Sequence, residues 1–359
     1  MTDSEVEFKT AVSTDAGIPL APFFWLGDRQ ACGHYRMVQP AKALARKHHV
    51  QLEVGARSSL PYTLIVAQRS QETEPIEFLK HIKSVRQNGI PKVIYELDDD
   101  FWNIQPDNPA YANYTDPIRR ARIEEAIRIS DAVTVSTEPL ANILRQYNEN
   151  VYVLPNSISK RYLNELTYPY RTGDPGKPYV LGWCGSKTHE LDFKMCVSAL
   201  NTLMKFDPNT RMVFFGTSYS HLLDPAVRGQ CRTAPWTNSV HDYMELLSAA
   251  QIDVMLAPLN SSKFNESKSN LRILEANSLG IPVVATDFGP YSGGFFDSSP
   301  GTMTVAAGDS WIPALTHLSS SPMTRLEMST AGRSWVEKHF VQENTVDLWK
   351  ETMLNVLSQ

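Results

Sequence analysis

The sequence lacks several features by which membrane proteins and metalloproteins are recognised. No apolar run approaches the roughly 18 residues that a membrane-spanning helix needs. The opening stretch, MTDSEVEFKTAVSTDAG, is acidic and polar, without the apolar centre of a secretory signal peptide. The nine histidines form no HExxH motif, and the four cysteines show no paired metal-type spacing (Cys32, Cys184, Cys196 and Cys231). We therefore expect a cytoplasmic protein with reduced thiols, no metal site and no stable membrane insertion.

Positive charge is not in excess either. The net charge of −5 gives no overall basic field for nucleic acid or anionic membranes, although a local basic groove stays open. A hydrophobic share of 42% and a charged share of 20% are typical of a folded soluble protein. Because 359 residues are more than a domain with one ordinary hydrophobic core contains, the length predicts two domains.

Short apolar segments alternate with amphipathic ones along the chain. Segments such as PFFWLGD (22–28) and PKVIYELDDD (91–100) predict buried strands, and ELDFKMCVSALNTLMKF (190–206) predicts a helix. A polar stretch rich in glycine and proline, 171–178, interrupts the alternation, which then starts again. The pattern predicts an α/β fold with two successive parallel, doubly wound sheets. Ligands of such sheets bind beyond the carboxyl ends of the strands.

Glycines predict where two of the helices end. Gly89 is expected to close the helix 75–89, and Gly280 is expected to close the helix 270–279. The segment 281–286 that follows is entirely apolar apart from its last residue, which predicts a strand buried on both faces of a parallel sheet.

The turn after the predicted strand 179–185 is a first candidate for ligand binding. It consists of Gly185, Ser186 and Lys187. Glycine lets the backbone approach a ligand closely, and the amides at a helix N-terminus can hold a diphosphate. An ordinary tight turn is the alternative interpretation.

The segment KSNLRILEANSLGIPVVATDFGPY (268–291) is more informative. Lys268 and Arg272 lie four residues apart, so a helix would place them on one side, where they can neutralise a diphosphate. Glu275 lies among apolar residues, and a buried carboxylate is costly unless it has partners. Ribose hydroxyls would be suitable partners. The alternative is an intrahelical Arg272–Glu275 pair on a solvated face.

Two further groups of residues have open roles. In GHYR (33–36), Arg36 could reach a phosphate or an acceptor, or it could lie in solvent on the first turn of a helix. Trp102, Trp183 and Trp236 could stack on a sugar or a base, although each could equally pack in a core.

Four segments together resemble one enzyme family. LEANSLGIPVVATDFGPY (274–291) resembles the nucleotide-binding segment of retaining GT-B glycosyltransferases, the large glycosyl transferases group 1 family. The segments 133–159, 179–193 and 343–358 resemble, in the same order, other parts of these enzymes. The resemblance implies two Rossmann-like domains that face each other across a cleft. They would comprise an acceptor domain (1–170), a nucleotide-sugar domain (171–340) and a terminal helix that crosses back (341–359).

The resemblance also implies an activity and a set of site residues. It implies a hexosyl- or glycosyltransferase that uses a UDP-sugar, or alternatively a GDP-sugar, with retention and without a required cofactor. The implied donor-binding residues are Gly33, Arg36, Gly185, Ser186, Lys187, Trp236, Lys268, Ser269, Arg272 and Glu275. The implied catalytic residues are Asp99, Asp100 and Glu266. The chain departs from the family in two respects. The family places another glutamate eight positions before Glu275, where Ser267 stands next to Glu266. Many relatives also carry an arginine and a lysine after the strand equivalent to LGWCG, where this chain has only Lys187 nearby.

The three carboxylates Asp98–Asp100 admit more than one role. They repel one another, so a bound cation, arginine partners or sugar hydroxyls must stabilise them. They contain D-x-D, the metal signature of the GT-A architecture, but we favour contact with the acceptor or the transferred sugar. The rival functions are a sugar-nucleotide 2-epimerase and a non-catalytic nucleotide-sugar-binding module. The acceptor is not specified and could be a glycan, a protein, a small molecule or a modified DNA base.

Overall fold

The chain forms two compact units in the computed structural model, which describes residues 10, 12–69, 71–166, 177–293 and 298–359. The first unit comprises Met1–Trp102, Ala112–Asn156 and Gln342–Gln359. The second unit comprises Asn103–Tyr111 and Ser157–Val341. The sequence-based boundary at 170 and 171, and most of the polar stretch 171–178, lie outside the described residues.

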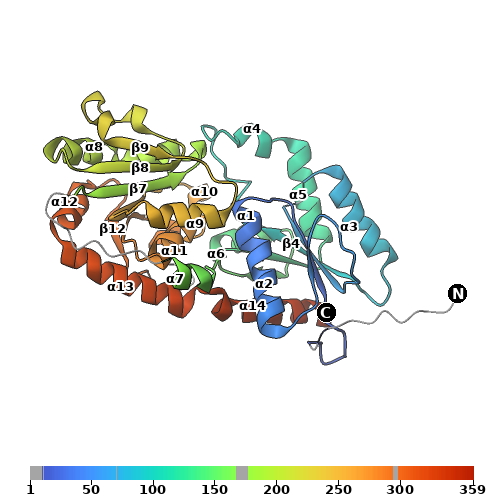
Figure 1. The fold of residues 1–359 in the computed structure, drawn as a ribbon. Coiled ribbons are helices and arrows are strands. Elements are labelled where there is room, and N and C mark those ends of the chain that lie inside the picture. The colour runs from blue at the N-terminus through green and yellow to red at the C-terminus, as the bar shows by residue number, and fades with distance from the viewer. Residues whose placement is uncertain (1–9, 11, 70, 167–176, 294–297) are drawn as a thin grey trace. The chain divides into compact units, whose positions relative to one another are not determined.

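The first unit is built on six parallel strands in the order β2-β1-β3-β4-β5-β6 (Figure 1). These strands are β1 (Pro22–Trp25), β2 (Glu53–Gly55), β3 (Leu64–Gln68), β4 (Lys92–Leu97), β5 (Ala132–Val135) and β6 (Val151–Val153). The second and third strands pair with opposite edges of the first, so the strand order reverses at β1. The predicted parallel α/β architecture is confirmed for this half of the chain.

Apolar side chains cover both faces of this sheet because successive residues of a strand point to opposite sides. On one face, Val66 and Ile94 pack with Leu44 of α2 and Trp349 of α14. On the other face, Ile65 packs with Leu79 of α3 and others. The helices in this part of the chain are α1 (Ala31–Gly33), α2 (Gln39–His48), α3 (Thr73–Val85), α4 (Tyr111–Tyr114), α5 (Pro117–Ile129), α6 (Glu138–Leu144) and α14 (Gln342–Ser358).

One predicted helix limit in the first unit differs from the structure. The predicted C-cap at Gly89 is wrong, because α3 ends at Val85 and Arg86 is already extended, with φ −61° and ψ 141°. Gly89 has a φ of 76° and lies in the turn before β4 instead. In the same unit, α2 is preceded by a π-helical turn, His34–Val38.

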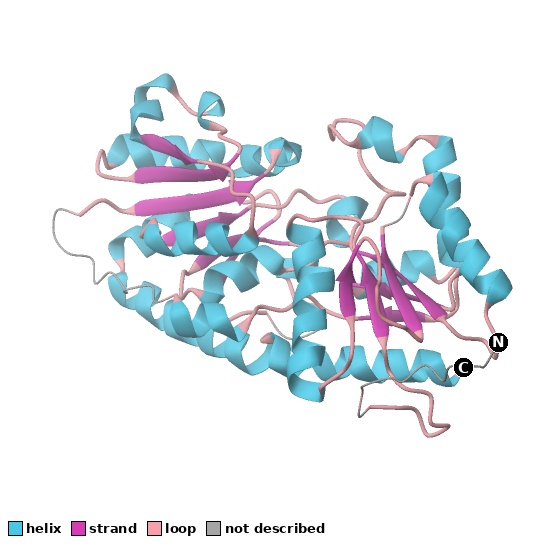
Figure 2. Ribbon diagram, turned by 45° about the vertical axis from the view of Figure 1, so that its right-hand side comes forward, coloured by secondary structure: helices cyan, strands magenta, loops and turns pink. Residues whose placement is uncertain are grey.

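The second unit also contains six parallel strands, in the order β12-β11-β10-β7-β8-β9. These strands are β7 (Val180–Gly185), β8 (Arg211–Gly216), β9 (Cys231–Ala234), β10 (Val254–Ala257), β11 (Val283–Asp287) and β12 (Thr302–Ala306). Its helices are α7 (Lys160–Glu165), α8 (Glu190–Phe206), α9 (Val240–Ala249), α10 (Lys263–Glu266), α11 (Leu271–Ser278), α12 (Ile312–Ser320) and α13 (Pro322–His339). Figure 2 shows the helices packed around the strands of each sheet.

The predictions made from local sequence patterns are confirmed for α8, α11 and β11 of this unit. The bounds of α8 are those predicted, 190–206. α11 ends before Gly280, whose φ of 73° is the left-handed conformation of a C-terminal glycine, so that prediction is confirmed. From Val283 to Thr286, β11 is buried on both faces, as its apolar sequence predicts.

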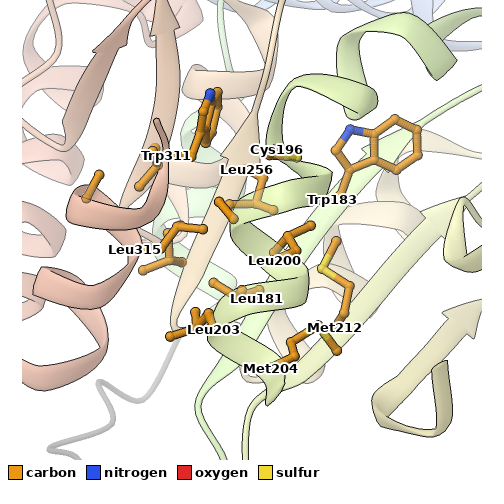
Figure 3. Close-up of a cluster of buried hydrophobic side chains, with 14 of the residues drawn as sticks. Leu181, Trp183, Cys196, Leu200, Leu203, Met204, Met212, Leu256, Trp311 and Leu315 are labelled. Carbon is orange, nitrogen blue, oxygen red and sulfur yellow. The ribbon is translucent and has the colours of Figure 1, made fainter. Parts of the chain in front are cut away.

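A large apolar cluster fixes α8 against the sheet (Figure 3). α8 contributes Cys196, Leu200 and Leu203, whose spacing of three and four residues forms one helical stripe. Leu181 and Trp183 of β7 lie beneath them. Fully burying one leucine side chain contributes roughly 1.5–3 kcal/mol, so this stripe also fixes the turn that joins β7 to α8.

Candidate functional site

The strand order of the second unit reverses at β7. β8 and β10 pair with opposite edges of this strand, so the crossing connections leave in opposite directions. Ligands of open α/β sheets bind beyond the carboxyl ends of the strands at such a reversal. We therefore expect a ligand site at the segments that follow β7 and β10 and at the first turn of α11.

The turn after β7 contains the predicted residues Gly185, Ser186 and Lys187. Lys187 is exposed, and Ser186 caps the single turn of 3-10 helix Lys187–His189 by accepting from Thr188 N at 3.4 Å. A Cβ atom on Gly185 would lie 2.7 Å from the indole of Trp183. The glycine is thus required by packing against Trp183, whatever ligand the turn binds.

Trp236 is an exposed aromatic residue at the same end of the sheet. Its side chain is 59% exposed, and its ring lies 3.1 Å from the position that a Cβ atom on Gly216 would take. Gly216 ends β8, has a φ of 91° and is paired in register with Gly185. An exposed indole beside a strand end is a surface on which a planar ring can stack.

Trp102 and Trp183 are packed against other side chains. Trp183 is fully buried in the core of the second unit. In the first unit, Trp102 stacks on Tyr147 with ring centroids 5.4 Å apart and donates from Nε1 to Glu124 at 3.2 Å. Core packing, the alternative considered from the sequence, accounts for Trp183.

Lys268 and Arg272 precede and begin α11. Lys268 Nζ lies 4.3 Å from the ring centroid of Phe264, and the guanidinium of Arg272 lies 5.9 Å from that of Trp183. Among the described residues, Arg272 Nη1 is buried and has no hydrogen-bond partner. Burial opposes its charge, but Tyr291 and other neighbouring groups raise the pKa of Arg272 above its ordinary value. A protonated donor is therefore held at this edge of the sheet, and an anion can satisfy it.

Glu275 is buried, with 9% of its surface exposed. The hydroxyl of Tyr243, on α9, donates to its Oε2 at 3.3 Å. This burial excludes the alternative of an ion pair on a solvated face. A carboxylate has further lone pairs than one hydroxyl uses, so Glu275 can accept more hydrogen bonds.

The predicted catalytic Glu266 is exposed at the end of α10. The next residue, Ser267, is 2% exposed, and its hydroxyl lies 3.4 Å from Lys263 O. Gly289, with a φ of 56°, packs against the backbone of Glu266, because a Cβ atom there would lie 3.3 Å from Glu266 Cα. Ser269 is partly buried just before α11.

A buried aspartate that the sequence did not single out connects these segments. Asp192 is 3% exposed in the first turn of α8, and its Oδ2 lies 2.8 Å from His189 Nδ1. Its Oδ1 accepts from Asn260 N at 2.8 Å, Asn260 Nδ2 at 2.6 Å and Asn265 Nδ2 at 3.2 Å. Burial raises the pKa of Asp192, but its hydrogen bonds to His189 and Asn260 outweigh this, so the carboxyl remains ionised. Acidic residues are common in the first turn of a helix, so this role of Asp192 could not be predicted from the sequence.

The glycine turn of the first unit is explained by packing. A Cβ atom on Gly33 would lie 1.7 Å from Asp28 O, so only glycine fits between these segments. Arg36 is 1% exposed, lies 2.6 Å from Glu96 and donates to Leu154 O. The solvent-exposed alternative for Arg36 is therefore wrong. Its Nη2 is buried and has no hydrogen-bond partner among the described residues, so contact of Arg36 with a phosphate stays a prediction.

Arg69 holds two of the three aspartates after β4, Asp98 and Asp99. Its guanidinium lies 3.4 Å from Asp98 and 4.0 Å from Asp99, and it donates to Tyr114 Oη at 2.8 Å. Asp100 is 1% exposed and accepts from Trp102 N at 3.0 Å. Of the three partners considered from the sequence, the structure therefore provides the arginine. Asp99 is the more accessible of the two predicted catalytic aspartates.

The described residues contain neither a cluster of metal-binding side chains nor a membrane-spanning helix. No group of three or more histidine, cysteine, aspartate or glutamate side chains in this part of the chain is arranged to hold a metal ion. Within the same residues, no helix has both the length and the apolar character needed to cross a membrane.

Comparison with known proteins identifies relatives of this fold. HepE from Anabaena, solved with UDP-glucose, is 13% identical with a TM-score of 0.62, covering 94% of this chain and 99% of that one. A glycosyltransferase from Rickettsia africae is 12% identical with a TM-score of 0.62, covering 95% and 99%. The pneumococcal O-GlcNAc transferase GtfA, solved with UDP and GlcNAc, is 15% identical with a TM-score of 0.54, covering 82% and 57%.

Sequence comparison also indicates a similarity to glycosyltransferases. None of the proteins with curated descriptions matches the chain. Residues 194–351, which include α11 and the loop before it, match the family described as Glycosyl transferase-like. The chain therefore carries a glycosyl transferase-like segment at 194–351 and has the fold of the GT-B glycosyltransferases, with two Rossmann-like parallel sheets.

Proposed function

We propose that this protein is a glycosyltransferase that moves a sugar from a nucleoside diphosphate sugar to an acceptor. The observation that carries the proposal is Arg272, whose charged guanidinium has a buried Nη1 without a hydrogen-bond partner among the described residues, at the reversal point of the second sheet. The family match at 194–351 includes this residue. HepE, of similar fold, was solved with UDP-glucose, which favours a UDP-sugar as donor, with a GDP-sugar as the alternative.

The second unit provides a group for each part of such a donor. Lys268 and Arg272 neutralise the diphosphate, assisted by Ser186, Lys187 and Ser269 at the neighbouring segments. The indole of Trp236 stacks on the base, since it is exposed beside the end of β8. Glu275 accepts the ribose hydroxyls in addition to the hydroxyl of Tyr243.

The reaction depends on stabilising the diphosphate as it leaves. Cationic side chains and helix amides that are already in position supply this stabilisation without a metal ion. We propose that transfer retains the anomeric configuration, as in the retaining enzymes that the sequence resembles. Glu266 and Asp99 then contact the transferred sugar or the acceptor, and Asp100 shapes the segment that carries Asp99. The acceptor is a glycan, a protein, a small molecule or a modified DNA base.

Binding measurements test the proposal most directly. A thermal-shift screen against UDP-, GDP-, ADP- and TDP-sugars should identify one that raises the melting temperature, and calorimetry then gives its Kd. Lys268→Ala and Arg272→Ala should each weaken binding by roughly 1.5–3 kcal/mol, the typical contribution of a hydrogen bond to a charged group. Lys205→Ala is the matched control, because this exposed lysine lies in the last turn of α8, away from the reversal point. If no nucleotide sugar binds, the proposal is wrong.

One observation favours a second candidate function. Ser267, a buried hydroxyl, stands eight positions before Glu275, where the related enzymes have a carboxylate near the transferred sugar. A chain without that carboxylate could bind the donor and no longer turn it over. Tight binding of a nucleotide sugar without consumption, in the presence of a range of acceptors, would support such a binding module. Release of a new sugar nucleotide without any acceptor would instead indicate an epimerase.

A further inference from the structure

The pair formed by His189 and Asp192 has no role in the function proposed so far. His189 is the last residue of the short turn after β7, and Asp192 follows in the first turn of α8 (Figure 1). The 2.8 Å separation between His189 Nδ1 and Asp192 Oδ2 is that of a charge-assisted hydrogen bond. Three hydrogen bonds from Asn260 and Asn265 hold the other oxygen of Asp192. The imidazole is therefore anchored to a carboxylate that cannot easily move.

This anchor determines how the imidazole is oriented. An ionised carboxylate only accepts hydrogen bonds, so Nδ1 must carry the hydrogen that lies between the two groups. In the neutral ring, Nε2 then has a lone pair and no hydrogen. Cδ2, the ring atom next to Nε2, lies 3.2 Å from the position of a Cβ atom on Gly185. The Cδ2 side of the imidazole thus lies against the carboxyl end of β7, next to the turn in which the ligand is expected.

The charges around His189 keep the free imidazole neutral. Burial lowers the pKa of His189, and the positive charges of Arg272 and Lys268 lower it further. Asp192 alone raises the pKa, and the net shift is downward. Because Asp192 does not outweigh burial and the two neighbouring cations, the imidazolium needs a second anion before it becomes favourable.

The other titratable groups near this ring do not supply that anion. Tyr219 donates its hydroxyl to Ser186 O at 3.0 Å, and burial raises its pKa to about 12, so it is neutral. Burial likewise raises the pKa of Tyr291, which lies near Arg272. Glu190 is paired with Lys194 at 2.8 Å on the outer side of α8. The charge that would stabilise an imidazolium must therefore come from a ligand.

We propose that His189 is a diphosphate-binding residue that takes up one proton from solvent when the nucleotide sugar binds. This inference rests on the proposed function and deepens it. The negative charge of the diphosphate neutralises Arg272 and Lys268, so the imidazolium becomes favourable. Its new Nε2–H then donates to a phosphate oxygen while Asp192 keeps Nδ1–H in place. Donor binding becomes coupled to one proton, and Asp192 acts as the positioning residue for this contact.

Proton uptake can be measured by calorimetry in two buffers of different ionisation enthalpy at the same pH. UDP-glucose is the probe, because its diphosphate lacks the terminal phosphate group that ionises near pH 6 in a phosphomonoester. We expect uptake of a substantial fraction of one proton at neutral pH. Affinity should weaken as the pH rises between the pKa values of the free and bound imidazole, by up to about tenfold per pH unit. NMR titration of the His189 ring should give a higher pKa in the complex than in the free protein.

Two variants separate this role from a general effect on binding. His189→Asn should abolish the proton uptake and most of the pH dependence. His317→Asn, at an exposed histidine on α12, should leave both unchanged. UDP-glucose binding without proton uptake in the unmodified protein, or uptake that persists in His189→Asn, overturns the inference and leaves the proposed function intact. If no nucleotide sugar of the UDP-, GDP-, ADP- and TDP-sugar screen binds, the proposed function itself is wrong and the inference falls with it.

Discussion

Replacing Glu275 tests whether a buried carboxylate is present for the nucleotide rather than for the fold. Glu275 is 9% exposed in α11 and accepts the Tyr243 hydroxyl at 3.3 Å. Burial of a carboxylate costs free energy unless its oxygens are hydrogen-bonded. If both ribose hydroxyls donate to it in the complex, Glu275→Ala should lose two charge-assisted hydrogen bonds from binding. We expect the Kd for UDP to rise at least about tenfold, or on the order of 1.4 kcal/mol.

The size of the effect can be bounded with two neighbouring variants. A hydrogen bond to a charged group contributes roughly 1.5–3 kcal/mol, so a tenfold loss in Glu275→Ala is a lower limit. Glu275→Gln keeps the shape and removes the charge, so its affinity should be intermediate. Tyr243→Phe removes only the hydroxyl that donates to Glu275. It should change stability by about 0.5–1.5 kcal/mol and leave the ribose contact in place.

A ligand that lacks the ribose hydroxyls completes the experiment as a double-substitution cycle. With the unmodified protein, calorimetry should show that 2′,3′-dideoxy-UDP binds much more weakly than UDP. With Glu275→Ala, the two ligands should bind about equally, because the acceptor of both hydroxyls is gone. A 1 kcal/mol change in stability shifts the melting temperature of a domain of this size by about 2–4 °C. For Glu275→Ala without ligand, we expect a smaller shift of the melting temperature than this. If the melting temperature falls further while UDP affinity is unchanged, Glu275 is a structural partner of Tyr243 only.

Three further predictions concern metal, the aspartates and pH. Transfer should survive EDTA, and loss of activity that Mn²⁺ restores after chelation would refute the metal-free mechanism. Asp99→Ala should lose activity more than it loses donor affinity. Arg69→Met should destabilise the first unit by about 1.5–3 kcal/mol in chemical denaturation, whereas Arg128→Met, at an exposed pair, should have little effect. Asp192→Asn should cost stability at pH 7 but not at low pH. The folded pKa of Asp192 is lowered, so its contribution is complete above the ordinary value of 3.8 and disappears as the pH falls through the folded value.

The parts of the fold that the sequence predicted are those fixed by local patterns. The bounds of α8 follow from its apolar stripe. The end of α11 follows from Gly280, because glycine is the residue that adopts a φ of 73° without strain. The prediction at Gly89 was wrong because this glycine also has a positive φ, but in a turn four residues beyond Val85, the last residue of the helix. A glycine reports a left-handed backbone and not which element it ends.

The candidate site could be predicted only in part because its key contacts join residues far apart in the chain. Arg69 and Asp98 are 29 positions apart, and Asp192 and Asn260 are 68 apart. Nothing local to an aspartate in the first turn of a helix shows that it will bind an asparagine after another strand. Arg36 is similar, because its burial depends on Glu96, which lies on a strand that it meets only in the folded sheet.

The structure also changes which substitutions are informative about ligand binding. Gly185 was selected from the sequence as a place where backbone approaches a phosphate, but a side chain there would collide with the indole of Trp183. Loss of binding in Gly185→Ala would therefore report disturbed packing at the end of β7 and not a lost contact. Arg272 and His189 lie beside the same turn, but each of their side chains has a polar atom to which a ligand can form a hydrogen bond. Only their substitutions can separate phosphate recognition from the folding of the turn that supports it.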